Sequence, residues 1–148
     1  MIAWSIEAAK KSDVFDRVLV STDDEDIASI SLKYGAEVPF LRTSAFDDLS
    51  SSSEATLVAL EQAEAYWSDS FNNVAQLMAN CPLRDSEGIK DSHKVFIVSR
   101  AESQISCLKF GWMIPWWAFK LNSLGEDEKL FPEALKMKSQ DLPELFCP

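Results

Sequence analysis

The sequence predicts an α/β fold with a mainly parallel sheet, and two apolar runs are the basis of this prediction. Residues 18–20 and 74–78 lack the polar alternation of a half-exposed strand, so we expect two strands buried on both faces that are central neighbours in the sheet. The first run ends at Ser21 and Thr22, and a helix with an acidic first turn follows at once, which gives half of a βαβ unit. Ligands of open α/β sheets bind at the carboxyl ends of such strands, so residues 21–24 are the first place to expect a site.

Helical periodicity predicts the other regular elements of the first hundred residues. The predicted helices cover residues 2–11, 24 to 33 or 34, 54–67 and 87–96. Residues suited to end or cap these helices are Gly35, as the left-handed end of the second, and Ser52 or Ser53 and Asp85, as N-caps of the third and fourth. A short strand is also expected over residues 37–41, and Pro39 confines it towards a sheet edge.

Two stretches of this region leave alternatives open. Residues 95–98 could extend a strand instead of the fourth helix, because periodicity does not separate the two for a short apolar run. The loop over residues 42–53 has the composition of a flexible Ser-rich linker. It nevertheless carries Arg42 directly after a strand, and Asp47 and Asp48 before a helix, which is also typical of a binding loop.

The last third of the sequence has a different character. Residues 104–118 show no clean helical period and hold three tryptophans around Pro115. These rings could form a small core, a partner interface or the wall of a ligand site. Pro143 and Pro148 argue against a long helix near the end of the sequence.

Composition narrows the classes of function. The net charge of −10 is the opposite of the balance expected for a protein that binds a nucleic acid polymer or an anionic membrane. A phosphate-bearing ligand would therefore need a few placed cations, backbone amides or a metal ion. No apolar run approaches the ~20 residues of a membrane span. Three cysteines without CxxC spacing favour a reduced, cytoplasmic protein with buried thiols over a disulfide or zinc site.

Five segments, in order, resemble one family of enzymes. They are IAWSIEAAKKS, FDRVLVSTDDEDIA, YGAEVPFLR, QLMANCPLRDSEGI and KSQDLPELFCP. Together they resemble the N-acylneuraminate (sialic or nonulosonic acid) cytidylyltransferases, or CMP-sugar synthetases. The resemblance implies a Rossmann-like, three-layer nucleotide-diphospho-sugar transferase fold. It also implies transfer of CMP from CTP to the anomeric hydroxyl of an acidic nine-carbon 2-keto sugar, release of pyrophosphate with Mg²⁺, and a homodimer built through an extension at about residues 101–140.

The same resemblance assigns binding roles to particular residues. It places Arg42, Ser52, Ser53 and Asn80 beside the nucleotide, and Lys138 and Gln140 beside the sugar. It assigns no catalytic residue, and some members of the family carry a glutamine at the position of Met78.

Simpler roles compete with several of these assignments. Arg42 could pair with Asp47 or Asp48 on the surface, and Arg84, in the turn after Asn80, could be a structural ion-pair partner. Asp23 and Asp24 are candidate metal ligands, but capping of the following helix explains their positions equally well.

The sequence also departs from the family pattern. These 148 residues contain neither the glycine- and basic-rich loop that holds the triphosphate nor the distal metal-binding aspartates. We therefore expect residues 1–148 to be a single partial domain, truncated at both ends and inactive by itself. The alternatives are a non-catalytic nucleotide- or sugar-binding module, and a protein-interaction module that uses the tryptophan-rich segment.

Overall fold

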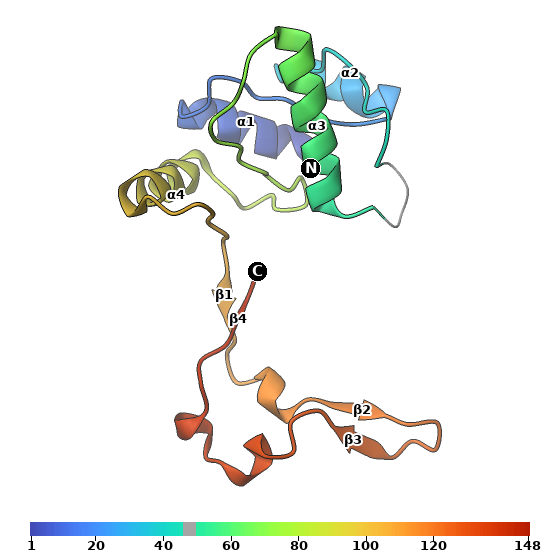
Figure 1. Ribbon diagram of the computed structural model, residues 1–148, viewed down its shortest axis with the longest axis vertical. Coiled ribbons are helices and arrows are strands. Elements are labelled where there is room, and N and C mark those ends of the chain that lie inside the picture. Colours follow the sequence, from blue (N-terminus) through green and yellow to red (C-terminus); the bar gives the residue numbers. More distant parts are fainter. Residues whose placement is uncertain (46–49) are drawn as a thin grey trace. The chain divides into compact units, whose positions relative to one another are not determined.

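The computed structural model describes residues 1–45 and 50–148, and these residues form two compact units (Figure 1). The N-terminal unit is Met1–Arg100, and the C-terminal unit is Ala101–Pro148. The first is helical with a small parallel strand pair, and the second is built from short antiparallel pairs and single helical turns. The chain therefore has the predicted α/β character. The boundary at Arg100 lies next to the start of the predicted extension, whose role stays a prediction.

The N-terminal unit contains the four predicted helices. They are α1 (Ile2–Ser12), α2 (Glu25–Lys33), α3 (Ser52–Trp67) and α4 (Ser86–Ser99). Asp85 caps α4 as predicted, and Gly35 follows α2 with φ of 82°, which is a left-handed conformation that glycine adopts without strain. Residues 95–98 belong to α4, so the alternative that they form a strand is wrong.

The cap of α3 differs from the prediction by one residue. Ser51, rather than Ser52 or Ser53, accepts a hydrogen bond from the backbone N–H of Glu54 at 3.2 Å, and the Glu54 carboxylate accepts one from the N–H of Ser51 at 2.7 Å. This reciprocal capping box fixes the register of the helix start. In a run of four serines, the glutamate three residues further on decides which serine is the cap, and the prediction did not use that spacing.

The predicted parallel sheet is reduced to one strand pair in the described residues. Leu19 and Glu37 form a parallel bridge, in which the N–H of Glu37 donates to the carbonyl of Val18 at 2.8 Å and the N–H of Val20 donates to the carbonyl of Glu37 at 3.0 Å. Residues 74–78 run without strand pairing, and the exposed fractions of Val74 and Met78 are 53% and 44%.

The prediction that residues 74–78 are a central strand beside residues 18–20 is therefore wrong for this structure. An apolar run becomes a buried strand only where neighbouring strands satisfy its backbone groups on both sides. Isolated parallel pairs are weak, so a sheet of this kind needs several strands to form together.

Small side chains form the core of the N-terminal unit. Helix α1 packs against α4 and α2, and Ile6 and Ile89 are the large apolar residues that are almost fully buried. Alanines fill most of the remaining core positions: Ala8, Ala9, Ala36, Ala59 and Ala63. Close approach of helices through alanine permits tight packing but buries little apolar area per residue.

The C-terminal unit consists of two antiparallel pairs joined by single helical turns. Strands β1 (Leu108–Lys109) and β4 (Phe146–Cys147) pair with each other, and β2 (Phe119–Leu121) pairs with β3 (Asp127–Lys129). The turns are the 3₁₀ segments η1 (Pro115–Trp117), η2 (Ala134–Lys136) and η3 (Ser139–Asp141). The absence of a long helix from this unit agrees with the lack of helical periodicity in its sequence.

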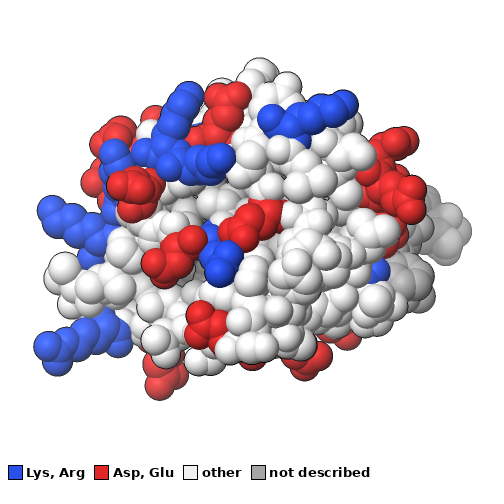
Figure 2. All heavy atoms as spheres, turned by 90° about the horizontal axis from the view of Figure 1, so that it is seen from above, with Lys and Arg blue, Asp and Glu red and all other residues white. Residues whose placement is uncertain are grey.

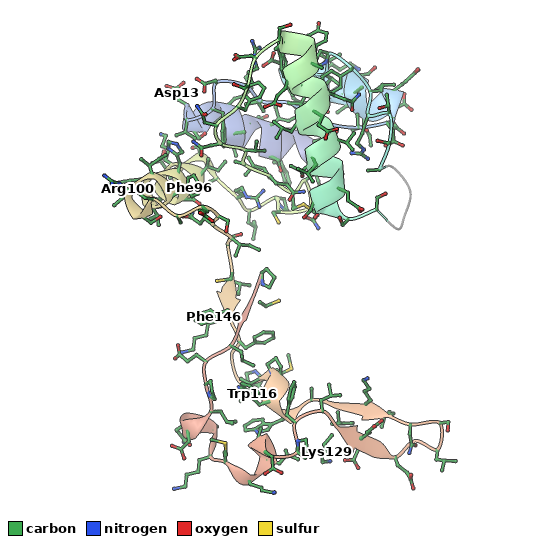
Figure 3. The ribbon with its side chains drawn as sticks, in the orientation of Figure 1. Asp13, Phe96, Arg100, Trp116, Lys129 and Phe146 are labelled. Carbon is green, nitrogen blue, oxygen red and sulfur yellow. The ribbon has the colours of Figure 1, made fainter. Side chains whose placement is uncertain are left out.

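The tryptophans of the C-terminal unit have different environments. The indole N–H of Trp116 (Figure 3) donates to the carbonyl of Pro143 at 2.9 Å, and its ring lies edge-on to Phe131 at 5.3 Å. Trp112, in contrast, is 84% exposed. Trp116 therefore belongs to the small core of this unit, whereas Trp112 is available at its surface.

Two surface properties bear on the sequence-based expectations. None of the helices in the described residues is long and apolar enough to cross a bilayer. Cys81, Cys107 and Cys147 are unpaired, and all three are exposed, whereas buried thiols were expected; Cys147 lies in the two-residue strand β4, whereas Cys81 and Cys107 lie outside the helices and strands. Figure 2 shows basic and acidic side chains interspersed on the face that it presents, without a broad basic surface.

Candidate nucleotide site at a strand end

The polar turn after the first strand is built by hydrogen bonds between residues two and three positions apart. The hydroxyl of Thr22, which is buried, accepts from the backbone N–H of Asp24 at 3.1 Å, and Asp24 then caps α2 by accepting from the N–H of Ile27 at 2.8 Å. The acidic first turn of α2 faces the positive end of the helix dipole. The sequence STDDED therefore makes the sharp transition from strand to helix that was predicted.

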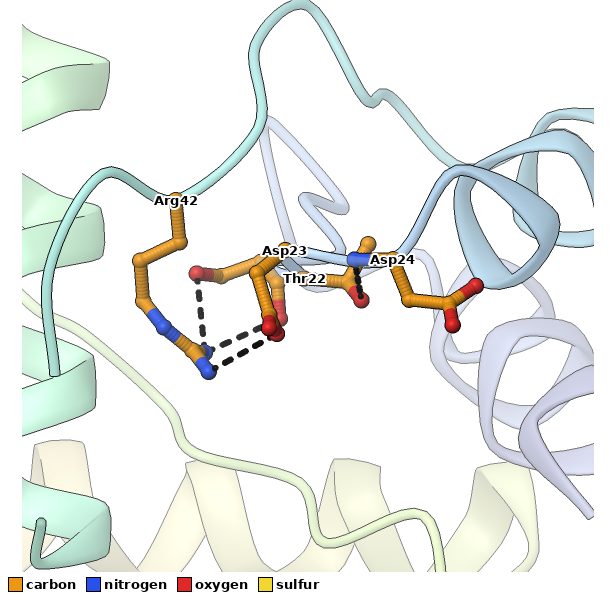
Figure 4. Close-up of polar contacts among 5 residues, drawn as sticks. Thr22, Asp23, Asp24 and Arg42 are labelled. Carbon is orange, nitrogen blue, oxygen red and sulfur yellow. Dashed lines mark hydrogen bonds and ion pairs between the residues drawn. The ribbon is translucent and has the colours of Figure 1, made fainter. Parts of the chain in front are cut away.

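Arg42 lies over this turn and is held there by backbone and side-chain contacts (Figure 4). Its backbone N–H donates to the carbonyl of Thr22 at 2.8 Å. Its guanidinium Nη1 donates to the carbonyl and the hydroxyl of Ser21 at 3.3 and 3.5 Å, and Nη2 contacts the Asp23 carboxylate at 3.5 Å. The structure thus brings Arg42 to the carboxyl end of the strand, where ligands of α/β folds bind.

The guanidinium of Arg42 retains unused hydrogen-bonding capacity. The side chain is 15% exposed, its Nε is buried without a hydrogen-bond partner in the described residues, and the three contacts of its other nitrogens are long. The Nε–H group therefore has no acceptor among the described residues, while Nη1 and Nη2 each have at least one. The predicted alternative, a pair with Asp47 or Asp48, lies outside the described residues.

Asp23 and Asp24 both have protein partners in this arrangement, and their role as metal ligands stays a prediction. One carboxylate oxygen of Asp24 accepts the capping hydrogen bond, and its side chain points away from Arg42 in Figure 4, whereas Asp23 is paired with a guanidinium. Mg²⁺ that accompanies a nucleotide is usually bound by one or two carboxylates together with phosphate oxygens and waters in octahedral geometry. The described residues contain no group of three or more His, Cys, Asp or Glu side chains that could hold a metal.

Ser52 and Ser53 lie in the first turn of α3 with exposed side chains. The carbonyl of Ser52 accepts a hydrogen bond from the Gln76 side chain at 3.2 Å and another from the hydroxyl of Thr56 at 2.8 Å. Gln76 thereby ties the 74–78 segment to the start of α3. A helix N-terminus with free hydroxyls suits an anionic ligand, so the predicted role of the two serines stays a prediction.

Asn80 and Arg84 lie in the turn that follows the 74–78 segment. The guanidinium of Arg84 donates to the carbonyl of Met78 at 3.1 Å, and the Ser5 hydroxyl on α1 lies 3.5 Å from the same oxygen. Arg84 therefore has a structural contact, while the side chain of Asn80 is exposed. In the described residues no hydrogen bond or ion pair joins Arg42 to Ser52, Ser53 or Asn80.

The two residues predicted to bind sugar lie in the C-terminal unit. Lys138 precedes η3 and accepts through its carbonyl from the N–H of Asp141 at 2.9 Å, and Gln140 accepts from the Ser139 hydroxyl at 3.2 Å. Both residues are exposed.

Two contacts that support Arg42 were not predicted from the sequence. Ser21 supplies both acceptors for Nη1 of Arg42, and Gln62 donates from α3 to the carbonyl of Leu41 at 3.0 Å. Ser21 lies within residues 21–24, where a site was predicted, but its contact with Arg42 was not predicted. Gln62 could have been noticed as a polar residue next to the buried positions Ala59 and Ala63 on one face of a helix.

The fold and the strand-end turn thus define an α/β protein with a polar turn and an arginine at the carboxyl end of a strand, which is where ligands of α/β proteins commonly bind. Residues 1–90 match the family model described as cytidylyltransferase, and the chain therefore belongs to the cytidylyltransferase family. This finding confirms the resemblance seen in the sequence motifs.

Curated relatives are similar over nearly the whole chain. A pseudaminic acid cytidylyltransferase from Campylobacter jejuni is 33% identical over 147 residues, which cover 99% of this chain and 62% of the relative. A CMP-N,N'-diacetyllegionaminic acid synthase from Legionella pneumophila is 30% identical over 151 aligned positions, covering 99% of this chain and 60% of the relative. An N-acylneuraminate cytidylyltransferase from Escherichia coli is 30% identical over 96 residues, 65% of this chain and 22% of the relative. The chain thus spans about three fifths of the first two relatives.

Proposed function

We propose that this chain belongs to an enzyme that transfers CMP from CTP to the anomeric hydroxyl of a nonulosonic acid. The observation that carries the proposal is the family match over residues 1–90, which contains the strand-end turn, Arg42 and the start of α3. The relatives that align along the chain act, by their names, on pseudaminic and legionaminic acids. An acidic nine-carbon 2-keto sugar is therefore the proposed acceptor class.

The proposed reaction forms one phosphorus–oxygen bond and breaks another. The anomeric hydroxyl oxygen of the sugar attacks the α-phosphorus of CTP and its proton passes to solvent. The bond from the α-phosphorus to the oxygen that bridges to the β-phosphate breaks, and pyrophosphate leaves with the electron pair. Such a transfer depends mainly on positioning and on stabilisation of the leaving charge. We assign Arg42 to the nucleotide because its guanidinium is anchored at a strand end in an otherwise acidic surrounding.

The other predicted binding residues complete the proposal. Ser52 and Ser53 would offer hydroxyl and amide donors at the start of α3, and Asn80 would offer an amide in the turn after residue 78. Lys138 and Gln140 would contact the sugar, for which an ammonium supplies charge but lacks the planar fork of arginine. Mg²⁺ is proposed to accompany CTP, as phosphate chemistry commonly requires, and no residue of this chain is assigned to it.

The proposed extension at about residues 101–140 would mediate a homodimer. Large apolar side chains are exposed in the C-terminal unit, among them Leu108 at 77%, Trp112 at 84% and Leu124 at 81%. Exposed apolar groups of this size are typical of surfaces that a partner covers.

We also propose a cytoplasmic location, because three unpaired cysteines suit a reducing compartment.

The test of the proposed function uses two proteins. One is the 148-residue chain, and the other is a chimera that joins these residues to the segments of the Campylobacter jejuni relative that the alignment leaves uncovered. Pyrophosphate release is measured with CTP, Mg²⁺ and, in separate reactions, pseudaminic, legionaminic and N-acetylneuraminic acids. We expect no measurable transfer by the 148 residues alone, because they contain no glycine- and basic-rich triphosphate loop, and transfer by the chimera with one of the acids.

Two controls make this experiment decisive. ATP and UTP replace CTP in parallel reactions, and the chimera is compared with the complete relative. CTP-dependent pyrophosphate release from the 148 residues alone would overturn the expectation that they are inactive. A folded chimera that neither binds CTP nor releases pyrophosphate would contradict the cytidylyltransferase proposal.

A non-catalytic nucleotide-binding module is the second candidate. Arg42 lies beside Ser21 at the strand end, an arrangement that would hold a nucleotide whether or not transfer follows. A chimera that binds CTP as tightly as the relative but transfers no CMP to any of the three acids would support this candidate.

A further inference from the structure

The peptide group between Leu41 and Arg42 is held from both sides. Its carbonyl, on Leu41, accepts a hydrogen bond from Nε2 of Gln62 at 3.0 Å, and its N–H, on Arg42, donates to the carbonyl of Thr22 at 2.8 Å. Gln62 lies on α3, 21 residues further along the chain, and its side chain is partly buried. One peptide plane is thus fixed by a helix at one edge and by the strand end at the other.

This peptide plane determines where the Arg42 side chain begins. With both polar groups fixed, rotation about the bonds that flank the plane would break at least one hydrogen bond. The position of the Arg42 Cα and the direction of its N–Cα bond are therefore set, and from there the guanidinium reaches Ser21 and Asp23 over contacts of 3.3 to 3.5 Å. Contacts of that length are weak, so they do not by themselves hold the side chain in place.

Gln62 is a poor choice for stability alone. Its Oε1 is buried without a hydrogen-bond partner in the described residues, as is Nε of Arg42. A buried acceptor or donor left unpaired is destabilising, whereas an apolar side chain of the same length would remove the penalty at Gln62. The neighbouring core positions on α3, Ala59 and Ala63, are apolar. The hydrogen bond to Leu41 is what the amide adds at this position.

We propose that Gln62 is a positioning residue for Arg42, and that it acts on nucleotide affinity only through this arginine. The proposal rests on the proposed function in one respect, namely that Arg42 contacts the nucleotide. Replacing the side-chain amide of Gln62 by an apolar group of equal length should leave the Leu41 carbonyl without its hydrogen bond. The guanidinium of Arg42 should then adopt a wider range of directions and become more exposed.

The first experiment measures the arginine directly and needs no ligand. The 148-residue chain is treated with phenylglyoxal, and the modification rate of each arginine is followed by peptide mass mapping. In Gln62→Met, and in Gln62→Glu as a second variant, we expect Arg42 to react about fivefold faster, as expected for loss of one neutral hydrogen bond. Arg84 should react at the wild-type rate in the same sample. The control Glu61→Met, an exposed neighbour on α3, should leave Arg42 unchanged.

The second experiment is a double-mutant cycle on CTP affinity. Gln62→Met should raise the dissociation constant for CTP about fivefold in the wild-type background and less than twofold in the Arg42→Ala background. A general structural role would weaken binding by the same factor in both backgrounds. Circular dichroism confirms that each variant is folded.

The outcomes separate this inference from the proposed function. The cycle is measured in the chimera: if the folded chimera without substitutions does not bind CTP, the function proposed for the chain fails, and the phenylglyoxal rates still decide the role of Gln62. An Arg42 rate that stays within twofold of wild type in both folded Gln62 variants overturns the inference. Equal CTP losses in the two backgrounds overturn it as well.

Discussion

Replacement of Arg42 tests the candidate site most directly. The side chain is 15% exposed and makes three contacts of 3.3 to 3.5 Å, one of them with Asp23, whose own side chain is 46% exposed. A partly exposed ion pair contributes up to about 1 kcal/mol, and the long contacts to Ser21 add little. We therefore expect Arg42→Ala to lower the free energy of unfolding by about 1 kcal/mol.

The effect of the same variant on CTP binding should be larger. The net charge of −10 repels a triphosphate, and a cation placed beside the ligand offsets part of this repulsion. Loss of the Arg42 guanidinium removes that local attraction. A charge-assisted hydrogen bond contributes about 1–3 kcal/mol, which corresponds to a loss of about 5- to 150-fold in affinity. Arg42→Lys should recover only part of the loss, because lysine keeps the charge but not the planar fork.

Calorimetric titration of CTP into the wild type and both variants measures these effects, with the chimera used alongside the 148-residue chain. Raising the salt concentration should shrink the difference in CTP affinity between wild type and Arg42→Ala, because salt screens the exposed part of the attraction. Unchanged affinity in a folded Arg42→Ala protein would refute the assignment of this residue to the nucleotide. Complete recovery by lysine would refute the role of the fork.

Three further predictions concern stability and are checked by thermal and urea unfolding. Ser51→Ala should cost about 1 kcal/mol by removing the capping box of α3, whereas Ser53→Ala should be close to neutral, and equal losses would contradict the assignment of the cap. Gly35→Ala should cost about 1 kcal/mol or more because φ is 82° there, and an unchanged midpoint would exclude that backbone conformation. Arg84→Ala should lower the free energy of unfolding at least as much as it weakens the free energy of CTP binding, because Arg84 donates to the carbonyl of Met78. A loss of affinity alone would make Arg84 a ligand-binding residue.

The elements that the sequence predicts correctly are those with local causes. Helices α1, α2 and α4, the caps Asp24 and Asp85 and the left-handed Gly35 depend on side chains within one turn of the residue concerned. The strand-to-helix turn at the candidate site has the same local origin, since Thr22 and Asp24 bond to backbone groups two or three residues away. Such features can be predicted without knowledge of the fold.

Features that depend on distant partners could not be predicted from the same patterns. An apolar run such as residues 74–78 indicates a tendency to be buried, but strand pairing requires a second run in register. The contact of Gln62 with Leu41 and that of Arg42 with Ser21 each join residues 21 positions apart, and neither leaves a periodic signal in the sequence. The resemblance to the cytidylyltransferases identified Arg42 because it compares whole motifs, but it gave no account of what holds this arginine.

The alanine-rich core has a consequence for how the chain should melt. Six of the eight almost fully buried apolar residues in the described part of the chain are alanines, so unfolding exposes little additional apolar surface at these positions. Both the heat-capacity change and the denaturant m-value scale with newly exposed surface. Unfolding curves should therefore be shallow, with a small slope against urea and weak curvature against temperature. A ligand that orders the chain on binding should then make the unfolding transition steeper and also raise its midpoint.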